Sequence, residues 1–266
     1  MLMNDTKPRI KIYYSIAVVF LSIILLLNQF LFTFQRVWAF KFKKSFEMKA
    51  NTQILDQNGQ NIDIYIVDKE SDTDLIFIHG SIASGKVYRQ TLDKMAEKTN
   101  CNVIGYYFRG MNNKRGQPTE KSIVEESFLV GDFVKSRGKK LIIYGQSLGC
   151  SVALSLANYL NIQKTILENP FTKYIEIIKN RSYVRWFYYL VVDTWDNIKR
   201  IEKYKGDLLI FTSENDTIVP SDNSYRLSKL HKGTKVQKLA GNTHFDVQKN
   251  VNYHNYICDF INQNSQ

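Results

Sequence analysis

Short apolar runs alternate with longer amphipathic stretches from residue 62 to residue 261, and this alternation restricts the fold more than any other feature of the chain. The apolar runs are bounded by Gly, Asn or Asp and most are rich in β-branched or aromatic residues, as strands are. These runs are Ile62–Val67, Leu75–His79, Val103–Phe108, Leu141–Tyr144, Thr165–Leu167, Leu208–Thr212 and Val236–Leu239. The helix-like stretches are Lys86–Lys98, Ser122–Arg137, Leu148–Leu160, Ser221–Leu230 and Val247–Ile261. Strand and helix in alternation predict an α/β fold, a mostly parallel sheet with helices on both faces.

Composition limits the function classes. Residues 51–266 suffice for one domain with a full core, and 44% hydrophobic residues exclude a disordered chain. Residues 1–50 carry eight basic and two acidic residues, whereas the other 216 carry 28 and 23, so the domain is only mildly basic. A dedicated nucleic-acid binder would place its charge on the folded domain, so we expect no nucleic-acid partner. Cys101, Cys150 and Cys258 form neither a disulfide framework nor a zinc pattern.

An almost wholly apolar segment occupies residues 12–34. As a helix it would be about 34 Å long, enough to cross a hydrocarbon core of about 30 Å. We therefore expect a basic tail at 1–11, a transmembrane signal anchor at 12–34 and a basic connector at 35–50. A cleaved signal peptide is the alternative, but its apolar region is shorter and residues 37–39 (Val-Trp-Ala) make a poor cleavage site. The basic residues on the two sides nearly balance, so the orientation stays open.

The strongest candidate for chemistry is the G-x-S-x-G sequence at residues 145–149, which contains Ser147. The strand-like run 141–144 leads into it and an apolar helix leads out, which is the setting of a nucleophile elbow. Glycines are needed because the turn is tight and larger side chains would collide with neighbouring strand and helix. The alternative is a serine in an ordinary glycine-rich turn.

A serine hydroxyl becomes a good nucleophile only when a base takes its proton and an acid orients that base. Glu214 and Asp216 follow the strand-like run 208–212, and His244 follows the next run. Both positions come just after strand carboxyl ends, where open α/β sheets build their sites. We predict Ser147, Asp216 and His244 as the catalytic triad, with Glu214 as the less favoured acid. The other histidines precede the nucleophile, end a helix or lie within one: His79, His231 and His254.

The loop after the run 75–79 matches the loop that donates one amide of an oxyanion hole. Its sequence, His79-Gly80-Ser81, predicts the backbone N–H of Ser81 as one donor and that of Leu148 as the other. We expect His79 to pack the loop. Residues 171–204 form an insertion that holds an aromatic stretch at 183–190. This insertion is either a buried aromatic helix or a cap that lines an acyl pocket.

From about residue 62 to the C-terminus, the chain resembles the α/β-hydrolase superfamily, and within it the membrane-anchored bud-emergence-type hydrolases related to the α/β-hydrolase domain-containing proteins. Beyond the triad positions, the resemblance rests on Phe-Arg-Gly at 108–110, Gly-Gln-Pro-Thr-Glu at 116–120 and Leu-Glu-Asn-Pro-Phe at 167–171. It implies a serine hydrolase tethered by one N-terminal helix, without metal or organic cofactor. Departures at Ser81, Met111, Cys150 and Phe245 remove no catalytic group but leave the substrate open.

These features together predict a membrane-anchored serine hydrolase that cleaves carboxylic esters or thioesters of acyl chains. The expected substrates are a lysophospholipid, a monoacylglycerol or an S-acylated protein, and the expected partner is the lipid bilayer. The expected location is a membrane of the endoplasmic reticulum or another endomembrane, with a single pass. Two alternatives remain: a catalytically silent membrane-anchored scaffold of the same fold, and a lipid-binding module that uses the basic connector.

Overall fold

The computed structural model describes residues 6–39, 50–56, 59–83, 85–111, 116–179 and 191–263. Within these residues, one eight-stranded sheet has the order β1-β2-β4-β3-β5-β6-β7-β8. The strands are β1 (Thr52–Leu55), β2 (Asn61–Val67), β3 (Thr73–Ile78), β4 (Asn102–Tyr106), β5 (Lys140–Gln146), β6 (Lys164–Glu168), β7 (Asp207–Ser213) and β8 (Thr234–Leu239). β2 pairs antiparallel with β1 and β4, and the other neighbours pair parallel. The predicted α/β class with a mostly parallel sheet is confirmed.

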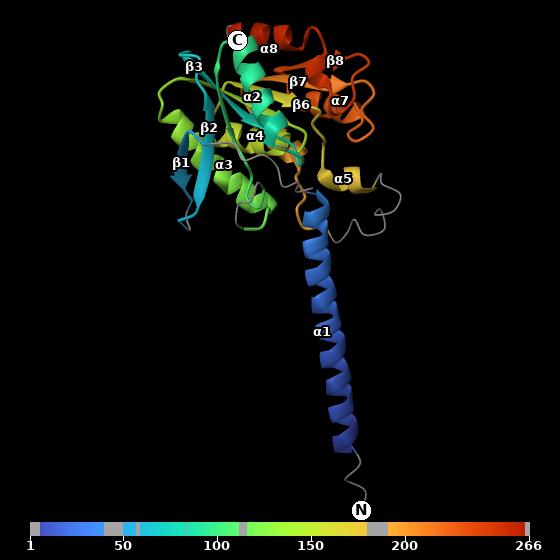
Figure 1. Cartoon of the computed structure of the whole chain (residues 1–266). Coiled ribbons are helices and arrows are strands. Elements are labelled where there is room, and N and C mark those ends of the chain that lie inside the picture. Colours follow the sequence, from blue (N-terminus) through green and yellow to red (C-terminus); the bar gives the residue numbers. More distant parts are fainter. Residues whose placement is uncertain are drawn as a thin grey trace, which may run out of the picture.

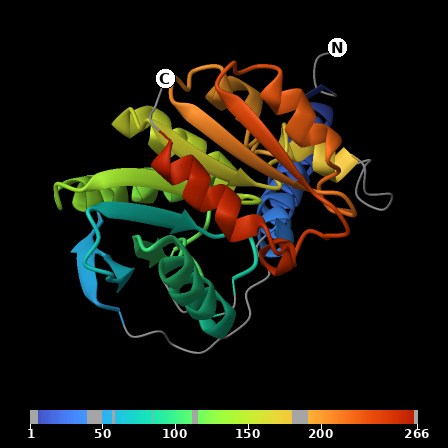
Figure 2. The same cartoon turned by 90° about the horizontal axis from the view of Figure 1, so that it is seen from above.

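Helices cover both faces of the sheet (Figure 2). One face carries α2 (Gly85–Thr99) and α8 (Tyr253–Asn262), which contact each other. The other face carries α3 (Glu120–Lys135), α4 (Gly149–Leu160), α6 (Asn197–Ile201) and α7 (Asp222–Ser228), and α4 contacts both α3 and α6. Because both faces are covered, every residue of β4 and β6 is buried. This packing fixes the carboxyl ends of the parallel strands along one edge.

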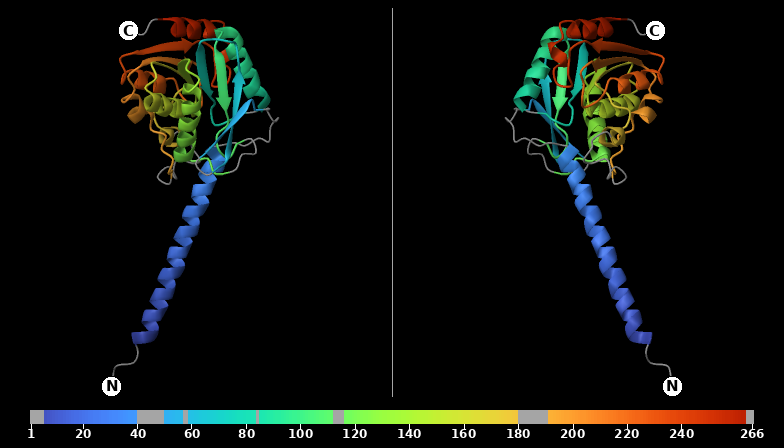
Figure 3. Two further views of the ribbon diagram at one scale, coloured as in Figure 1. Left: turned by 90° about the vertical axis from the view of Figure 1, so that its left-hand side faces the viewer. Right: turned by 90° about the vertical axis from the view of Figure 1, so that its right-hand side faces the viewer.

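The N-terminal helix α1 (Thr6–Ala39) extends away from the domain (Figures 1 and 3). It contains the predicted anchor segment 12–34 and is longer at both ends. Its span Lys11–Phe30 is long and apolar enough to cross a membrane, and none of it is buried against the rest of the protein. Exposed apolar surface of this extent is unfavourable in water. An apolar environment would therefore stabilise α1.

Outside the insertion at 171–204, two elements differ from the sequence prediction. β1 was not expected, and it forms because its backbone pairs with β2 from Thr52 to Leu55. The predicted helix 247–261 is interrupted, since a short 3₁₀ helix, η2 (Val247–Lys249), precedes α8. Asn250 causes the break: its side-chain oxygen accepts the backbone N–H of Asn252 at 3.1 Å, a local turn that competes with helix geometry.

The insertion at 171–204 is described only at its two ends. After β6 the chain forms α5 (Tyr174–Lys179), and a bridge between Lys173 and Asp196 closes the insertion, with Nζ 2.9 Å from Oδ2. The aromatic stretch 183–190 lies outside the described residues, as does most of the predicted basic connector, residues 40–49. The cap and the connector therefore stay predictions.

Candidate active site

Ser147 lies in a tight turn between β5 and α4. Its φ angle is 52°, a left-handed conformation that is uncommon for a residue with a side chain. The two glycines of the motif allow this turn to pack closely. A Cβ atom on Gly145 would lie 2.6 Å from Ala153 Cβ and from the carbonyl oxygen of Gly149. The turn is a strained strand-to-helix elbow of the kind that exposes a nucleophile at the edge of a sheet.

Gly149 provides a direct test of this packing. A Cβ atom there would lie 2.5 Å from the carbonyl oxygen of His79 and closer still to that of Ile78, and neither backbone atom can move freely. We expect Gly149→Ala to lower the free energy of unfolding by about 3 kcal/mol, the upper range for overpacking. The matched control is Gly138→Ala, where φ is +73° but a Cβ atom would meet open space. It should cost only about 1 kcal/mol of backbone strain. Urea denaturation measures both, and equal losses would contradict the packing argument.

The candidate base and acid come from the loops after β8 and β7. His244 and Asp216 are both buried, and His244 Nδ1 lies 2.6 Å from Asp216 Oδ2. His244 Nε2 lies 2.9 Å from Ser147 Oγ. The backbone N–H groups of Ile218 and Val219 each donate to Asp216 Oδ1 at 2.8 Å. These two bonds fix the carboxyl group, so that its other oxygen faces the imidazole.

Glu214, the less favoured acid, is bonded to residues other than His244. It is exposed, accepts Lys238 Nζ at 2.6 Å and accepts the backbone N–H of Gly241 at 3.1 Å. The bond from Lys238 is the main reason that the pKa of Glu214 lies below its usual value. Of the two acids, only Asp216 has a hydrogen bond to His244 among the described residues.

The candidate oxyanion donors flank the serine. A Cβ atom on Gly80 would lie 3.3 Å from Ser147 Cβ and from the carbonyl oxygen of Gln146, so the loop after β3 packs directly against the nucleophile turn. Among the described residues, neither the N–H of Ser81 nor that of Leu148 donates to a protein acceptor. Two unengaged amides beside a serine are what an oxyanion hole requires. The distances to a reacting oxygen depend on a bound substrate.

His79 lies behind this loop. It is buried against Tyr88 and Phe108, with ring centroids 5.1 Å and 4.2 Å from its own, and its Nδ1 lies 2.6 Å from Gly80 O. Burial lowers the pKa of His79 to about 4, so the ring is neutral at neutral pH. These contacts are those of a residue that packs the loop.

Two neighbouring residues at the end of β6 were not assigned a role from the sequence. Asn169 has a φ of 49°, and its side chain accepts the backbone N–H of Ser213 at 2.8 Å and donates to Ser213 Oγ at 3.1 Å. It thereby ties the end of β6 to the end of β7. Glu168 precedes it and is buried. The signal in the sequence was a polar pair directly after a buried strand.

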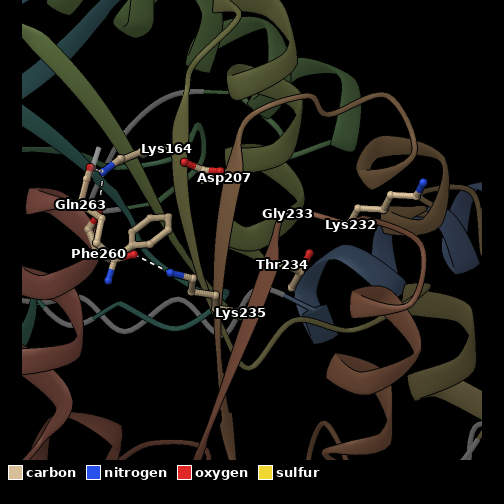
Figure 4. A pocket seen from close by; sticks show the side chains of 8 residues that line it. All are labelled: Lys164, Asp207, Lys232, Gly233, Thr234, Lys235, Phe260 and Gln263. Carbon is tan, nitrogen blue, oxygen red and sulfur yellow. Dashed lines mark hydrogen bonds between the residues drawn. The ribbon is translucent and has the colours of Figure 1, made fainter. Parts of the chain in front are cut away.

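A cavity of about 160 Å³ lies at the opposite edge of the sheet (Figure 4). Its lining includes Lys164 and Asp207, which begin β6 and β7. Lys164 Nζ donates to the carbonyl oxygens of Phe260 at 2.7 Å and Ile261 at 3.1 Å. The lysine thus binds the end of α8, and burial lowers its pKa. This cavity is remote from Ser147. The described residues contain no group of three or more His, Cys, Asp or Glu side chains placed to hold a metal ion.

The chain is similar in sequence to curated hydrolases. No protein-family model matches the chain. It is 27% identical over 219 residues to the lysophosphatidylserine lipase ABHD12 of Danio rerio, covering 70% of the chain and 57% of that protein. It is 24% identical over 194 residues to alpha/beta hydrolase domain-containing protein 17B of Homo sapiens, covering 71% and 66%. The chain thus spans little more than half the length of the first of these relatives.

Solved structures show the same fold. An esterase of Pyrococcus furiosus, Pf2001, superposes with a TM-score of 0.65 at 15% identity, covering 84% of this chain and 97% of that one. Est1E from Butyrivibrio proteoclasticus, with bound ferulic acid, has a TM-score of 0.63 at 17% identity, covering 80% and 100%. The fold is that of an α/β-hydrolase. Together with the curated relatives, this fold supports a hydrolase of the α/β-hydrolase type.

Proposed function

We propose that this protein is a membrane-anchored serine esterase or thioesterase that hydrolyses long acyl chains. The observation that supports the proposal most is the hydrogen-bonded line from Asp216 through His244 to Ser147. A neutral imidazole that donates from Nδ1 to the carboxylate accepts at Nε2, which is the state that a general base needs. Hydrolases and esterases among its relatives and structural neighbours support ester cleavage.

The proposed mechanism has two stages. His244 Nε2 takes the hydroxyl proton of Ser147 while Oγ attacks the acyl carbonyl carbon, and the amides of Ser81 and Leu148 donate to the oxyanion. The Asp216 carboxylate stabilises the imidazolium, which then gives its proton to the leaving alcohol or thiol. The acyl group stays on Ser147. Water, deprotonated by His244, attacks this acyl-enzyme, releases the carboxylic acid and restores the serine.

The proposed substrate class is an acyl ester that resides in a bilayer. α1 supports this because it would hold the domain at a membrane, and one relative is named a lysophosphatidylserine lipase. Among the candidates, a lysophospholipid is favoured over a monoacylglycerol or an S-acylated protein. We also propose a single pass through the endoplasmic reticulum or another endomembrane, which organelle fractionation tests.

Two charges in the apolar part of α1 test the anchor. Val19 and Ile23 lie one turn apart on α1 and are exposed. The variant Val19→Arg with Ile23→Arg should release the protein from membranes at alkaline pH, because each charge costs about 3 kcal/mol at the centre of a bilayer. The matched control replaces both residues by leucine and should stay membrane-bound. Carbonate extraction measures both. If the arginine variant stays in the membrane, α1 is not the anchor.

The activity is tested by fluorophosphonate labelling of the full chain in detergent, followed by a substrate panel. The panel compares a short soluble ester with lysophosphatidylserine, lysophosphatidylcholine, a monoacylglycerol and an S-acylated peptide. The proposal expects labelling, with the fastest turnover on a lysophospholipid. A folded wild-type protein that neither reacts with the probe nor hydrolyses any of these substrates would favour the catalytically silent scaffold.

A further inference from the structure

A buried carboxyl group lies directly beneath the nucleophile turn. Glu168 ends β6 and is 1% exposed. Three side chains donate to its carboxyl: Gln146 Nε2 to Oε1 at 2.8 Å, Tyr253 to Oε2 at 3.1 Å, and Tyr144 to Oε2. The hydroxyl oxygens of Tyr144 and Tyr253 are also only 2.5 Å apart. A fully buried carboxyl group lowers stability unless it is hydrogen-bonded, and these three donors supply its hydrogen bonds.

The same residue contacts the nucleophile turn through its main chain. The backbone N–H of Ser147 donates to the carbonyl oxygen of Glu168 at 2.8 Å. Cys150 Sγ, in the first turn of α4, donates to the same oxygen at 3.3 Å. The residue therefore holds the backbone of the serine through its carbonyl group and the neighbouring Gln146 through its carboxyl group.

Gln146 carries this restraint to the oxyanion loop. Its side-chain oxygen lies 3.9 Å from the place of a Cβ atom on Gly80, so the amide group packs beside the backbone that presents the Ser81 N–H. The amide nitrogen of the same group is the one bonded to Glu168. Loss of this bond would leave the Gln146 side chain without its anchor, between the nucleophile and one proposed oxyanion donor.

The pKa of Glu168 lies above its usual value because the carboxyl group is buried, and the hydrogen bonds from Tyr144, Gln146 and Tyr253 offset part of this effect. Burial raises the pKa of Tyr144, Tyr253 and Cys150 well above their usual values, so these groups stay protonated.

We propose that Glu168 is a positioning residue for acyl transfer: it fixes the nucleophile turn and Gln146 against the oxyanion loop. This inference rests on the proposed serine hydrolase mechanism. Glu168 does not touch the substrate, so its effect falls on kcat and leaves KM nearly unchanged. A purely structural carboxyl would change stability alone.

The test compares Glu168→Gln and Glu168→Ala in the full chain, with a short soluble ester as substrate. Glu168→Gln should lower kcat about tenfold with little change in KM, because a displaced nucleophile turn raises the activation free energy by about 1.4 kcal/mol. Glu168→Ala should lose about 100-fold, so glutamine partly rescues alanine.

The matched control is Glu126→Gln. Glu126 is also a buried glutamate, but it lies on α3 and pairs with Arg109 at 2.8 Å. The control should lose stability without a change in kcat. Tyr253→Phe removes one donor from Glu168 and should lower kcat about threefold, which tests the network even if the Glu168 variants do not fold.

Two outcomes overturn the inference and can be told apart. If wild type reacts with a fluorophosphonate and Glu168→Gln keeps the wild-type kcat, only the role of Glu168 is wrong. Tyr253→Phe with wild-type kcat has the same meaning where the Glu168 variants are unfolded. If folded wild type does not react with the probe, the proposed function fails and the inference fails with it.

Discussion

Replacement of Ser147 by alanine is expected to lower the hydrolysis of a soluble ester on the order of 10⁶-fold, the size found when a serine protease loses its nucleophile. The reason is that no acyl-enzyme can form without Oγ, which lies 2.9 Å from His244 Nε2. Covalent labelling by a fluorophosphonate should vanish as well. Stability should change little, because φ at this residue is 52° and alanine adopts it at a cost similar to that of serine.

Ser151→Ala is the matched control for this experiment. Ser151 follows in the first turn of α4 and is fully buried, and its hydroxyl has no hydrogen-bond partner among the described residues. Its removal therefore breaks no bond and should leave both hydrolysis and labelling at the wild-type level. A Ser147→Ala variant that still forms a covalent adduct, or a Ser151→Ala variant that does not, would move the nucleophile away from Ser147.

The fold could be predicted because its strongest determinant, hydrophobic periodicity, is local. The buried strands β3 to β7 read as short apolar runs, and the helices between them read as amphipathic. β1 escaped because Thr52–Leu55 is short and half exposed, and its pairing with β2 supplies what its composition lacks. The break at Asn250 escaped because a side-chain turn outweighed an apolar pattern that continued through it.

The sequence suggests the order of the candidate site residues but not the contacts that hold them. Ser147, Asp216 and His244 each follow a recognisable strand, and their order along the chain fits a Ser…Asp…His arrangement. The support around Glu168 could not be derived, since it joins side chains from β5, β6 and α8 that lie up to 109 residues apart. Only the three-dimensional packing brings Tyr144 and Tyr253 to one carboxyl group. The pattern at 167–171 marked a resemblance without indicating this contact.

Replacement of Asp216 by asparagine should lower kcat about 10⁴-fold in a folded protein. The structure gives the reason. Asp216 Oδ1 accepts the backbone N–H groups of Ile218 and Val219, so an asparagine must keep its oxygen there and turn its NH₂ group toward His244. The imidazole then accepts at Nδ1 and carries its proton on Nε2, the atom that faces Ser147 Oγ. A protonated Nε2 cannot take the serine proton.

The neighbouring acid supplies the control for this assignment. Glu214→Gln removes an exposed carboxylate that pairs with Lys238 at 2.6 Å, and it should keep kcat within about twofold, because an exposed ion pair is worth little. Steady-state kinetics on the soluble ester measures both variants, and thermal unfolding checks that they are folded. The opposite result, a silent Asp216→Asn with an inactive Glu214→Gln, would assign the acid to Glu214. Loss in neither would remove the acid from the proposed mechanism and leave His244 oriented by other contacts.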